Sequence, residues 1–192
     1  MQSGIWRKAG TLAAAAGAGL CFCLDPAQAL GECGRFGATP YTAERAVDIA
    51  GQTIRSHIYS QGAMEREDVT INGRLETRLV SRDRIVTYNL VTKTGFVQRL
   101  PAAPRAKKED ARVRVENAGA AKKLTLELRD AKGDWQLIES TTCRADGVPL
   151  ARTFTVTGQG AITTGQMTQS IVSTGKLDAA LFKVPADVKL KN

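Results

Sequence analysis

The sequence has 192 residues, with 27 Lys and Arg against 19 Asp and Glu and a formal net charge of +8. No apolar run reaches the roughly 20 residues of a membrane-spanning helix, which argues against a membrane span, and the length fits one domain. Aromatic residues make up only 5% of the chain, so the core must be built mainly from Val, Ile and Leu.

Residues 1–29 have the pattern of an export signal. A basic pair at positions 7 and 8 is followed by an apolar, Ala- and Gly-rich run over residues 12–24, and AQA before Leu30 is a small-x-small cleavage site. Cleavage near Ala29 would leave residues 30–192 as a single exported, periplasmic domain. A retained N-terminal anchor is the alternative. No twin-Arg pair precedes the apolar run, which favours general secretion.

The cysteines support the same compartment. Cleavage would remove Cys21 and Cys23 and leave an even pair, Cys33 and Cys143. In an oxidising compartment such a pair favours a disulfide. A loop of this length would stabilise the fold by roughly 3–5 kcal/mol in the chain-entropy model. A metal site is the alternative, but two cysteines without a neighbouring Cys or His do not make a zinc set. We expect no metal and no cofactor.

The stretch 41–101 predicts six consecutive antiparallel strands, separated by AGQ, GA, NG, DR and TKTG. Asn72-Gly73 is the sharpest turn signal, because both residues tolerate the positive φ of a two-residue hairpin. The arm after this turn, RLETRLV, alternates Leu and Thr with charged residues, which is the period of a half-buried strand. In the 41–49 segment Ala, Glu and Arg favour a helix, but its length matches the neighbouring strands and we expect a strand.

The rest of the chain continues this pattern after a linker. The linker, PAAPRAKKEDA at 101–111, is predicted to be a solvated crossover, with a mobile lid or a partner-docking loop as the alternative. Strand signals follow in ARVRVEN, KKLTLELRD, DWQLIESTTC, VPLARTFTVTG and QMTQSIVSTGK. The sequence thus predicts a mainly β protein of ten to eleven strands in one antiparallel sheet, with at most one or two short helices. The absence of a βαβ rhythm argues against an α/β enzyme.

The order of these segments resembles a known family. The succession GQT, G-x-MERE, NG, DR-IVTYNL and FVQRLP, with TTCRADGVPLARTFTV and GKLDAALFKVPADVKL at the end, is similar to LolA-like proteins of the outer-membrane lipoprotein-sorting superfamily. The resemblance covers most of residues 41–190 and rests on order and spacing. One departure is that the long amphipathic helix expected at the start of a lipoprotein carrier is hard to find between Leu30 and Tyr41.

The resemblance implies an open half-barrel whose concave apolar face holds a lipid or acyl chain. An open sheet with one apolar face must cover it with a helix, a lid or a ligand. An ordinary buried core is the alternative for the same residues. The candidates for the concave face are Ile54, Ile58, Leu75, Leu79, Val86, Leu90, Leu126, Leu128, Phe154 and Val156.

Other candidate sites are weaker. His57 is the only histidine. The nearby Ser56 and Ser60 are expected on the opposite face of the strand and no GxSxG elbow is present, so we expect a solvent-facing strand residue rather than a catalytic one. The carboxylates in MERED, at 64–68, are expected to be a solvated strand edge rather than a cation site. Arg74, Arg78 and Arg82 share one face of a strand and its turn and could contact an anionic surface such as lipid headgroups or an acidic protein. An ordinary mixed-charge surface is the alternative, because Glu76 lies between them.

Two functions follow from these expectations. The first is a periplasmic binding protein that holds a lipid or acyl chain, with a role in lipid or lipoprotein trafficking. The second is an envelope interaction or assembly module that uses its basic strand face on an acidic partner. We expect no catalysis, because no nucleophile and base can be assembled, and nucleic acid is not an expected partner of an exported protein without an aromatic platform.

Overall fold

The computed structural model describes residue 33 and residues 39–100, 110–158 and 161–191. The expected export signal and nearly all of the 101–111 linker lie outside the described residues. No described helix is long and apolar enough to cross a bilayer. The strands are β1 (Tyr41–Ile49), β2 (Gln52–Gln61), β3 (Met64–Ile71), β4 (Arg74–Val80), β5 (Arg84–Asn89), β6 (Thr94–Arg99), β7 (Ala111–Ala118), β8 (Ala121–Arg129), β9 (Trp135–Arg144), β10 (Pro149–Gly158), β11 (Ala161–Thr174) and β12 (Lys189–Lys191).

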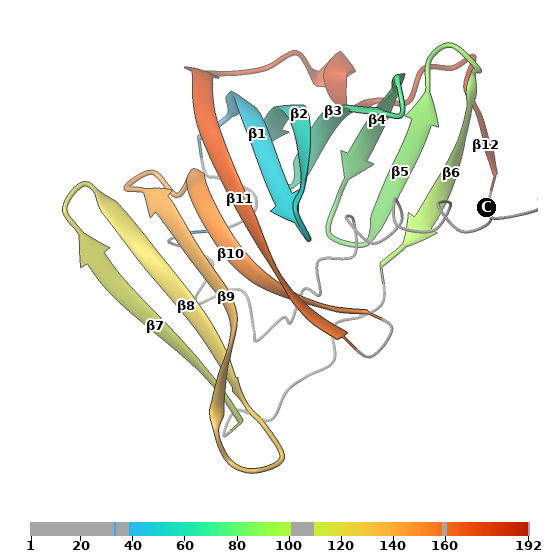
Figure 1. The fold of residues 1–192 in the computed structure, drawn as a ribbon. Coiled ribbons are helices and arrows are strands. Elements are labelled where there is room, and N and C mark those ends of the chain that lie inside the picture. The colour runs from blue at the N-terminus through green and yellow to red at the C-terminus, as the bar shows by residue number, and fades with distance from the viewer. Residues whose placement is uncertain (1–32, 34–38, 101–109, 159–160, 192) are drawn as a thin grey trace, which may run out of the picture.

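All twelve strands belong to one sheet, in the order β12-β6-β5-β4-β3-β2-β1-β11-β10-β9-β8-β7. Every neighbouring pair is antiparallel except β12, which runs parallel to β6. Figure 1 shows that the sheet curls strongly but that its two edge strands, β7 and β12, do not meet. The predicted open, mainly β fold is therefore confirmed. The difference in strand number comes from β12, which the sequence pattern of the tail did not predict.

The predicted turns hold the first six strands in register. Asn72 and Gly73 have φ values of 51° and 74°, so both central residues of the β3–β4 hairpin adopt the left-handed conformation. Ala50 and Gly51 do the same between β1 and β2. The 41–49 segment is strand β1, paired on one side with β2 and on the other with β11, which confirms the prediction of a strand over that of a helix.

The register divides the side chains between two faces of the sheet. We call inner the face that carries Tyr41, Ala43 and Ile58, and outer the opposite face. On the inner face, these three residues and Val148 form one buried cluster, with Ile171 packed against it. Successive pairing from strand to strand then assigns every residue to a face, because directly opposed residues point the same way.

A second buried cluster lies on the outer face of β4, β5 and β6. Its centre is Leu79, Val86 and Tyr88. Two valines of the C-terminal segment, Val184 and Val188, pack against this centre. Figure 1 shows the C-terminal segment crossing the upper ends of β1–β4 before it turns down into β12. The chain therefore covers this apolar part of its own outer face.

Hydrogen bonds hold the C-terminal segment in place along its length. The Leu177 amide donates to the side chain of Gln61 at 2.8 Å, and Arg66 donates to the carbonyl of Leu181, within the short 3-10 helix η3 (Ala179–Phe182), at 3.4 Å. The Lys189 amide then donates to the carbonyl of Lys93 at 2.9 Å and begins β12. The segment is thus a fixed layer rather than a loose tail.

A disulfide joins Cys33 to Cys143 across 110 positions of sequence, with a Cα–Cα distance of 5.7 Å. The disulfide links a residue that precedes β1 in the sequence with the end of β9. Both cysteines are buried. The pairing expected from the even count of cysteines after residue 29 is the one that the structure contains.

Candidate functional site

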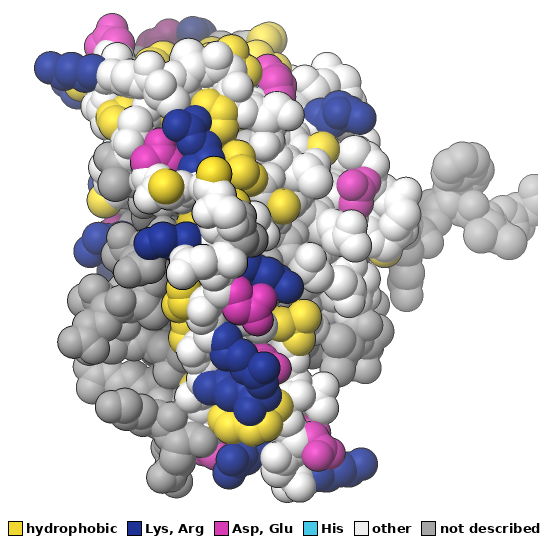
Figure 2. Space-filling model, turned by 90° about the vertical axis from the view of Figure 1, so that its left-hand side faces the viewer, with side chains coloured by type: hydrophobic (Ala, Val, Ile, Leu, Met, Phe, Trp, Pro, Cys, Tyr) yellow, Lys and Arg dark blue, Asp and Glu magenta, His cyan; other side chains and the backbone are white. Residues whose placement is uncertain are grey.

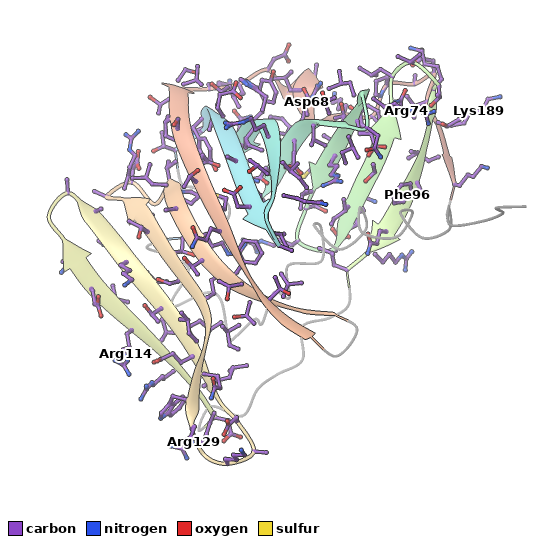
Figure 3. All side chains as sticks on the ribbon, in the orientation of Figure 1. Asp68, Arg74, Phe96, Arg114, Arg129 and Lys189 are labelled. Atoms are coloured by element: carbon purple, nitrogen blue, oxygen red, sulfur yellow. A yellow bond between two sulfur atoms is a disulfide. The ribbon has the colours of Figure 1, made fainter. Side chains whose placement is uncertain are left out.

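The inner face of β7, β8 and β10 is apolar over most of its length. Val113 lies opposite Leu126, and Val115 lies opposite Leu124. Figure 3 shows Arg114 and Arg129 pointing outward from these strands, so their neighbours in the alternation point inward. We call the following set the inner wall: Val113, Val115, Leu124, Leu126, Leu128, Phe154 and Val156.

The inner wall is more exposed than either buried cluster. None of its residues belongs to a buried core, and Val115 is 51% exposed. Within the described part of the chain, β7–β10 make extensive contacts only with the strands beside them in the sheet. A contiguous apolar sheet face of this kind needs a cover, such as another segment, a partner or a ligand.

The outer face of the same strands has the opposite character. Figure 2, which looks onto this side, shows Lys and Arg side chains with acidic side chains between them. Glu127 pairs with both Arg112 and Arg114, at 2.5 and 3.1 Å. Arg112 and Arg129 also lie over the ring of Trp135, at 4.2 and 4.8 Å from its centroid. These strands are therefore amphipathic, with water-compatible groups outside and aliphatic groups inside.

Gly165 in β11 leaves room for the ring of Phe154, the only aromatic residue of the inner wall. A Cβ atom on Gly165 would lie 2.6 Å from Cζ of Phe154, closer than such atoms approach, and a tight 3.2 Å from Cγ1 of Ile49. The ring of Phe154 therefore occupies the space that a larger residue would fill. The last predicted strand, QMTQSIVSTGK, starts one residue after this glycine, whereas β11 begins at Ala161, so the position of Gly165 within a strand was missed.

An ion pair between Arg152 and Glu139 lies on the inner face next to the inner wall. Arg152 bonds to Glu139 through Nη2, and the hydroxyl of Thr141 donates to the other oxygen of Glu139 at 2.8 Å. The side chains of Arg152 and Glu139 are 23% and 27% exposed. The guanidinium carbon of Arg152 is 5.4 Å from the centroid of Phe154. The Nε atom of Arg152 is buried and has no hydrogen-bond partner.

A more deeply buried ion pair lies beside the inner wall, on β1 and β3. Arg45 donates two hydrogen bonds to Glu65, at 3.0 and 2.8 Å, and a third to the amide oxygen of Gln169 at 3.1 Å. Gln169 in turn donates to the carbonyl of Pro149 at 2.9 Å. Burial alone would lower the pKa of Arg45, but the charge and hydrogen bonds of Glu65 outweigh it and the pKa is raised.

This network also acts on Tyr41. Burial, and then the charge of Glu65, raise the pKa of the Tyr41 phenol, while Arg45 opposes the shift. The next inward-facing pair of β1 and β11 after Arg45 and Gln169 is Val47 and Met167. The inner face is therefore apolar again beyond the network. The network therefore separates the buried inner cluster from the inner wall, and we assign it a structural role.

The ten residues predicted to share one concave face are divided between the two faces. The register puts Ile54, Ile58, Leu126, Leu128, Phe154 and Val156 on the inner face, and Leu75, Leu79, Val86 and Leu90 on the outer face. The prediction of a single face is therefore wrong. Alternation within one strand shows which residues lie together, but it does not show which face of the next strand they join.

The four outer-face residues have a different role from the one predicted. Leu79 and Val86 are buried in the outer cluster, and Leu90 packs against it. Leu75 is 49% exposed. On the inner face, Ile58 belongs to the buried cluster. Of the predicted set, only the four residues on β8 and β10 lie on the inner wall.

The predicted basic row is not a continuous surface. Arg78 lies on the inner face, where it pairs with Glu67 at 3.5 Å and its side chain is 14% exposed. Arg74 is exposed at the start of β4 (Figure 3). Arg82 is exposed in the turn after β4 rather than on the strand. Contact with an anionic surface stays a prediction for these residues.

The carboxylates of β3 point in opposite directions. Glu65 and Glu67 face inward, each towards an arginine, whereas Asp68 faces outward and accepts from Arg66 and Thr77. Among the described residues, no group of three His, Cys, Asp or Glu side chains could hold a metal ion.

His57 lies on the outer face, partly exposed. Its Nδ1 atom is 2.5 Å from Oε1 of Glu44, and its ring centroid is 4.7 Å from that of Tyr59. The position on the outer side of β2 agrees with the prediction of a solvent-facing strand residue.

Comparison with solved structures finds proteins of similar fold. An uncharacterized conserved protein from Thermus thermophilus is 16% identical, with a TM-score of 0.50, over 80% of this chain and 90% of that chain. A LolA superfamily protein from Nitrosomonas europaea is 11% identical, with a TM-score of 0.37, over 81% and 94% of the two chains. A DUF1329 family protein from Desulfovibrio piger is 12% identical, with a TM-score of 0.31, over 78% and 91%.

No protein-family model matches the chain, and no curated protein matches it in sequence. A LolA superfamily protein is among these structures of similar fold. At these identities the similarity concerns the fold alone. The function must therefore be argued from the surface that this chain itself presents.

Proposed function

We propose that the protein is an exported, non-catalytic binding protein whose inner wall holds a lipid or acyl chain. The observation that carries the proposal is the partly exposed apolar face of β7, β8 and β10, on the inner side of an open curled sheet. The residues of the inner wall are aliphatic or aromatic, and their outer-face neighbours are charged or polar. An alkyl chain is the ligand that fits such a surface, because it gains free energy in proportion to the apolar area that it buries.

Export is part of this proposal. A signal over residues 1–29 and the disulfide between Cys33 and Cys143 both suit an oxidising compartment. A role in lipid or lipoprotein trafficking would follow from binding a chain in the periplasm. The sequence of the exported protein should then begin at Leu30, which N-terminal sequencing of the secreted form would test.

An envelope interaction module that uses a basic strand face is the second candidate, and it has less support. Arg78, in the middle of the predicted basic row, already has Glu67 as a partner and faces inward. An acidic partner would have to displace this pair. Salt-sensitive capture that is lost on charge reversal at the exposed Arg74 and Arg82 would favour this candidate.

The test of chain binding compares two leucines of neighbouring strands. Leu126→Gln introduces an amide on the inner wall, whereas Leu137→Gln introduces the same amide on the outer face of β9, where Leu137 is 45% exposed. A fluorescent fatty acid is titrated into the purified protein and both variants. We expect L126Q to weaken binding by about tenfold or more, because a polar group in an apolar contact costs roughly 1–3 kcal/mol, and L137Q to bind as the wild type does.

Mass spectrometry of lipids extracted from the protein purified from its native compartment is the independent check. Absence of both co-purified lipid and fatty-acid binding would refute the proposal. Equal loss in L126Q and L137Q would place the ligand elsewhere than on the inner wall.

A further inference from the structure

Arg152 is a cation on the inner face of β10, next to the aromatic ring of the inner wall. It lies opposite Thr141 on β9 and Met167 on β11, and Phe154 follows on the same side of β10. Leu124 is the next residue across from Thr141. Met167, Phe154 and Leu124 would pack as well against an aliphatic side chain, so the charged pair of Arg152 and Glu139 calls for an explanation.

The hydrogen bonds of Arg152 are incomplete. Glu139 accepts from Nη2, while Nε is buried without any acceptor. A guanidinium offers five N–H donors in a planar fork that suits carboxylate and phosphate oxygens. Nε itself is buried, so an anionic oxygen would reach the guanidinium through the exposed part of the Arg152 side chain, which is 23% exposed.

We propose that Arg152 binds the anionic oxygen group at the head of an acyl chain lying on the inner wall, which makes the preferred ligand a single-chain anionic amphiphile. This inference rests on the proposed function. The guanidinium lies above Phe154 and faces the same side as Leu124 and Leu126. A head bound at Arg152 therefore leaves the chain next to the aliphatic side chains of β7 and β8.

Glu139 sets how strongly an anion is held. Its carboxylate lies opposite Leu126 and Phe154 and already pairs with Arg152. A ligand anion at Arg152 is attracted by the guanidinium and repelled by Glu139. Removal of the acidic charge alone should therefore strengthen anion binding, whereas removal of the basic charge should weaken it.

The experiment uses three ligands of one chain length: dodecanoate, dodecyl phosphate and dodecanol. Affinities for the purified protein are measured by displacement of a fluorescent fatty acid or by calorimetry. Arg152→Gln should weaken dodecanoate and dodecyl phosphate by about tenfold and leave dodecanol unchanged. Glu139→Gln should strengthen the two anions and also leave dodecanol unchanged. Arg114→Gln, which removes the same charge from the outer face, is the matched control and should change none of the three affinities.

The outcomes separate this inference from the proposed function. If the wild type binds dodecanol as tightly as the anions and R152Q changes nothing, chain binding stands and the head site is refuted. If R152Q weakens the binding of all three ligands alike, Arg152 acts only through the shape of the inner wall, and the head site is refuted. If the wild type binds none of them, the proposed function fails and the head site fails with it. E139Q keeps Arg152 in place, so its rise in anion affinity tests the site even if R152Q folds poorly.

Discussion

Removal of the buried carboxylate of Glu65 should be among the most destabilising single substitutions in this protein. Glu65 accepts two hydrogen bonds from Arg45, at 3.0 and 2.8 Å, and the two side chains are 1% and 11% exposed. Glu65→Gln keeps the shape of the side chain but leaves the guanidinium charge buried without its counter-ion. Breaking one partner of a buried pair costs about 3–5 kcal/mol. For a domain of this size that is roughly 6–20 °C in melting temperature.

The assay is urea unfolding followed by far-UV circular dichroism. The matched control is Asp187→Asn, since Asp187 pairs with Lys93 at the same 2.8 Å but the two side chains are 59% and 49% exposed. Solvent screens such a pair, so D187N should unfold as the wild type does. The double variant Arg45→Met, Glu65→Leu should recover most of the lost stability, because no charge remains buried. An E65Q protein that unfolds within about 1 kcal/mol of the wild type would refute the reasoning.

Three further substitutions test how the chain is held together. Gly95→Ala should lower the melting temperature, because the added Cβ would lie 2.4 Å from the carbonyl oxygen of Thr87 and would push β6 from β5; unchanged melting would contradict this close approach. Val188→Asp should destabilise by about 2 kcal/mol or more, since it places a charge against the outer cluster, and limited proteolysis should then cut the C-terminal segment first. Cys143→Ser should cost about 3–5 kcal/mol in urea unfolding, and the unreduced exported wild type should contain no free thiol.

The sequence predicted the first half of the sheet well because its signals are local. Asn72-Gly73 fixes a hairpin through backbone conformation alone, and the alternation of Leu75, Thr77 and Leu79 needs only neighbouring residues to be recognised. Both features appear in the structure where they were expected. Such signals determine where a strand lies and which of its residues share a side.

Local sequence signals do not determine which residues of distant strands lie on the same face of the sheet. Leu79 and Leu126 have the same alternating context in sequence, yet the register puts the first on the outer face and the second on the inner face. The assignment depends on pairings such as that of β1 with β11, which joins residues more than a hundred positions apart. The role of Val188 was missed for the same reason, because its partner surface lies about a hundred residues earlier in the chain.

The outer cluster and the inner wall differ in how the chain covers them. The outer cluster around Val86 is covered by the C-terminal segment, which is anchored at Gln61, Arg66 and Lys93. The inner wall has no comparable cover among the described residues, although its side chains are as apolar. A protein selected only for stability would gain by covering both faces or by making one of them polar, as it does on the outer side of β7–β9. An apolar surface kept partly open beside an arginine with an unfilled donor is better explained by a bound chain with a polar head than by an unfinished core.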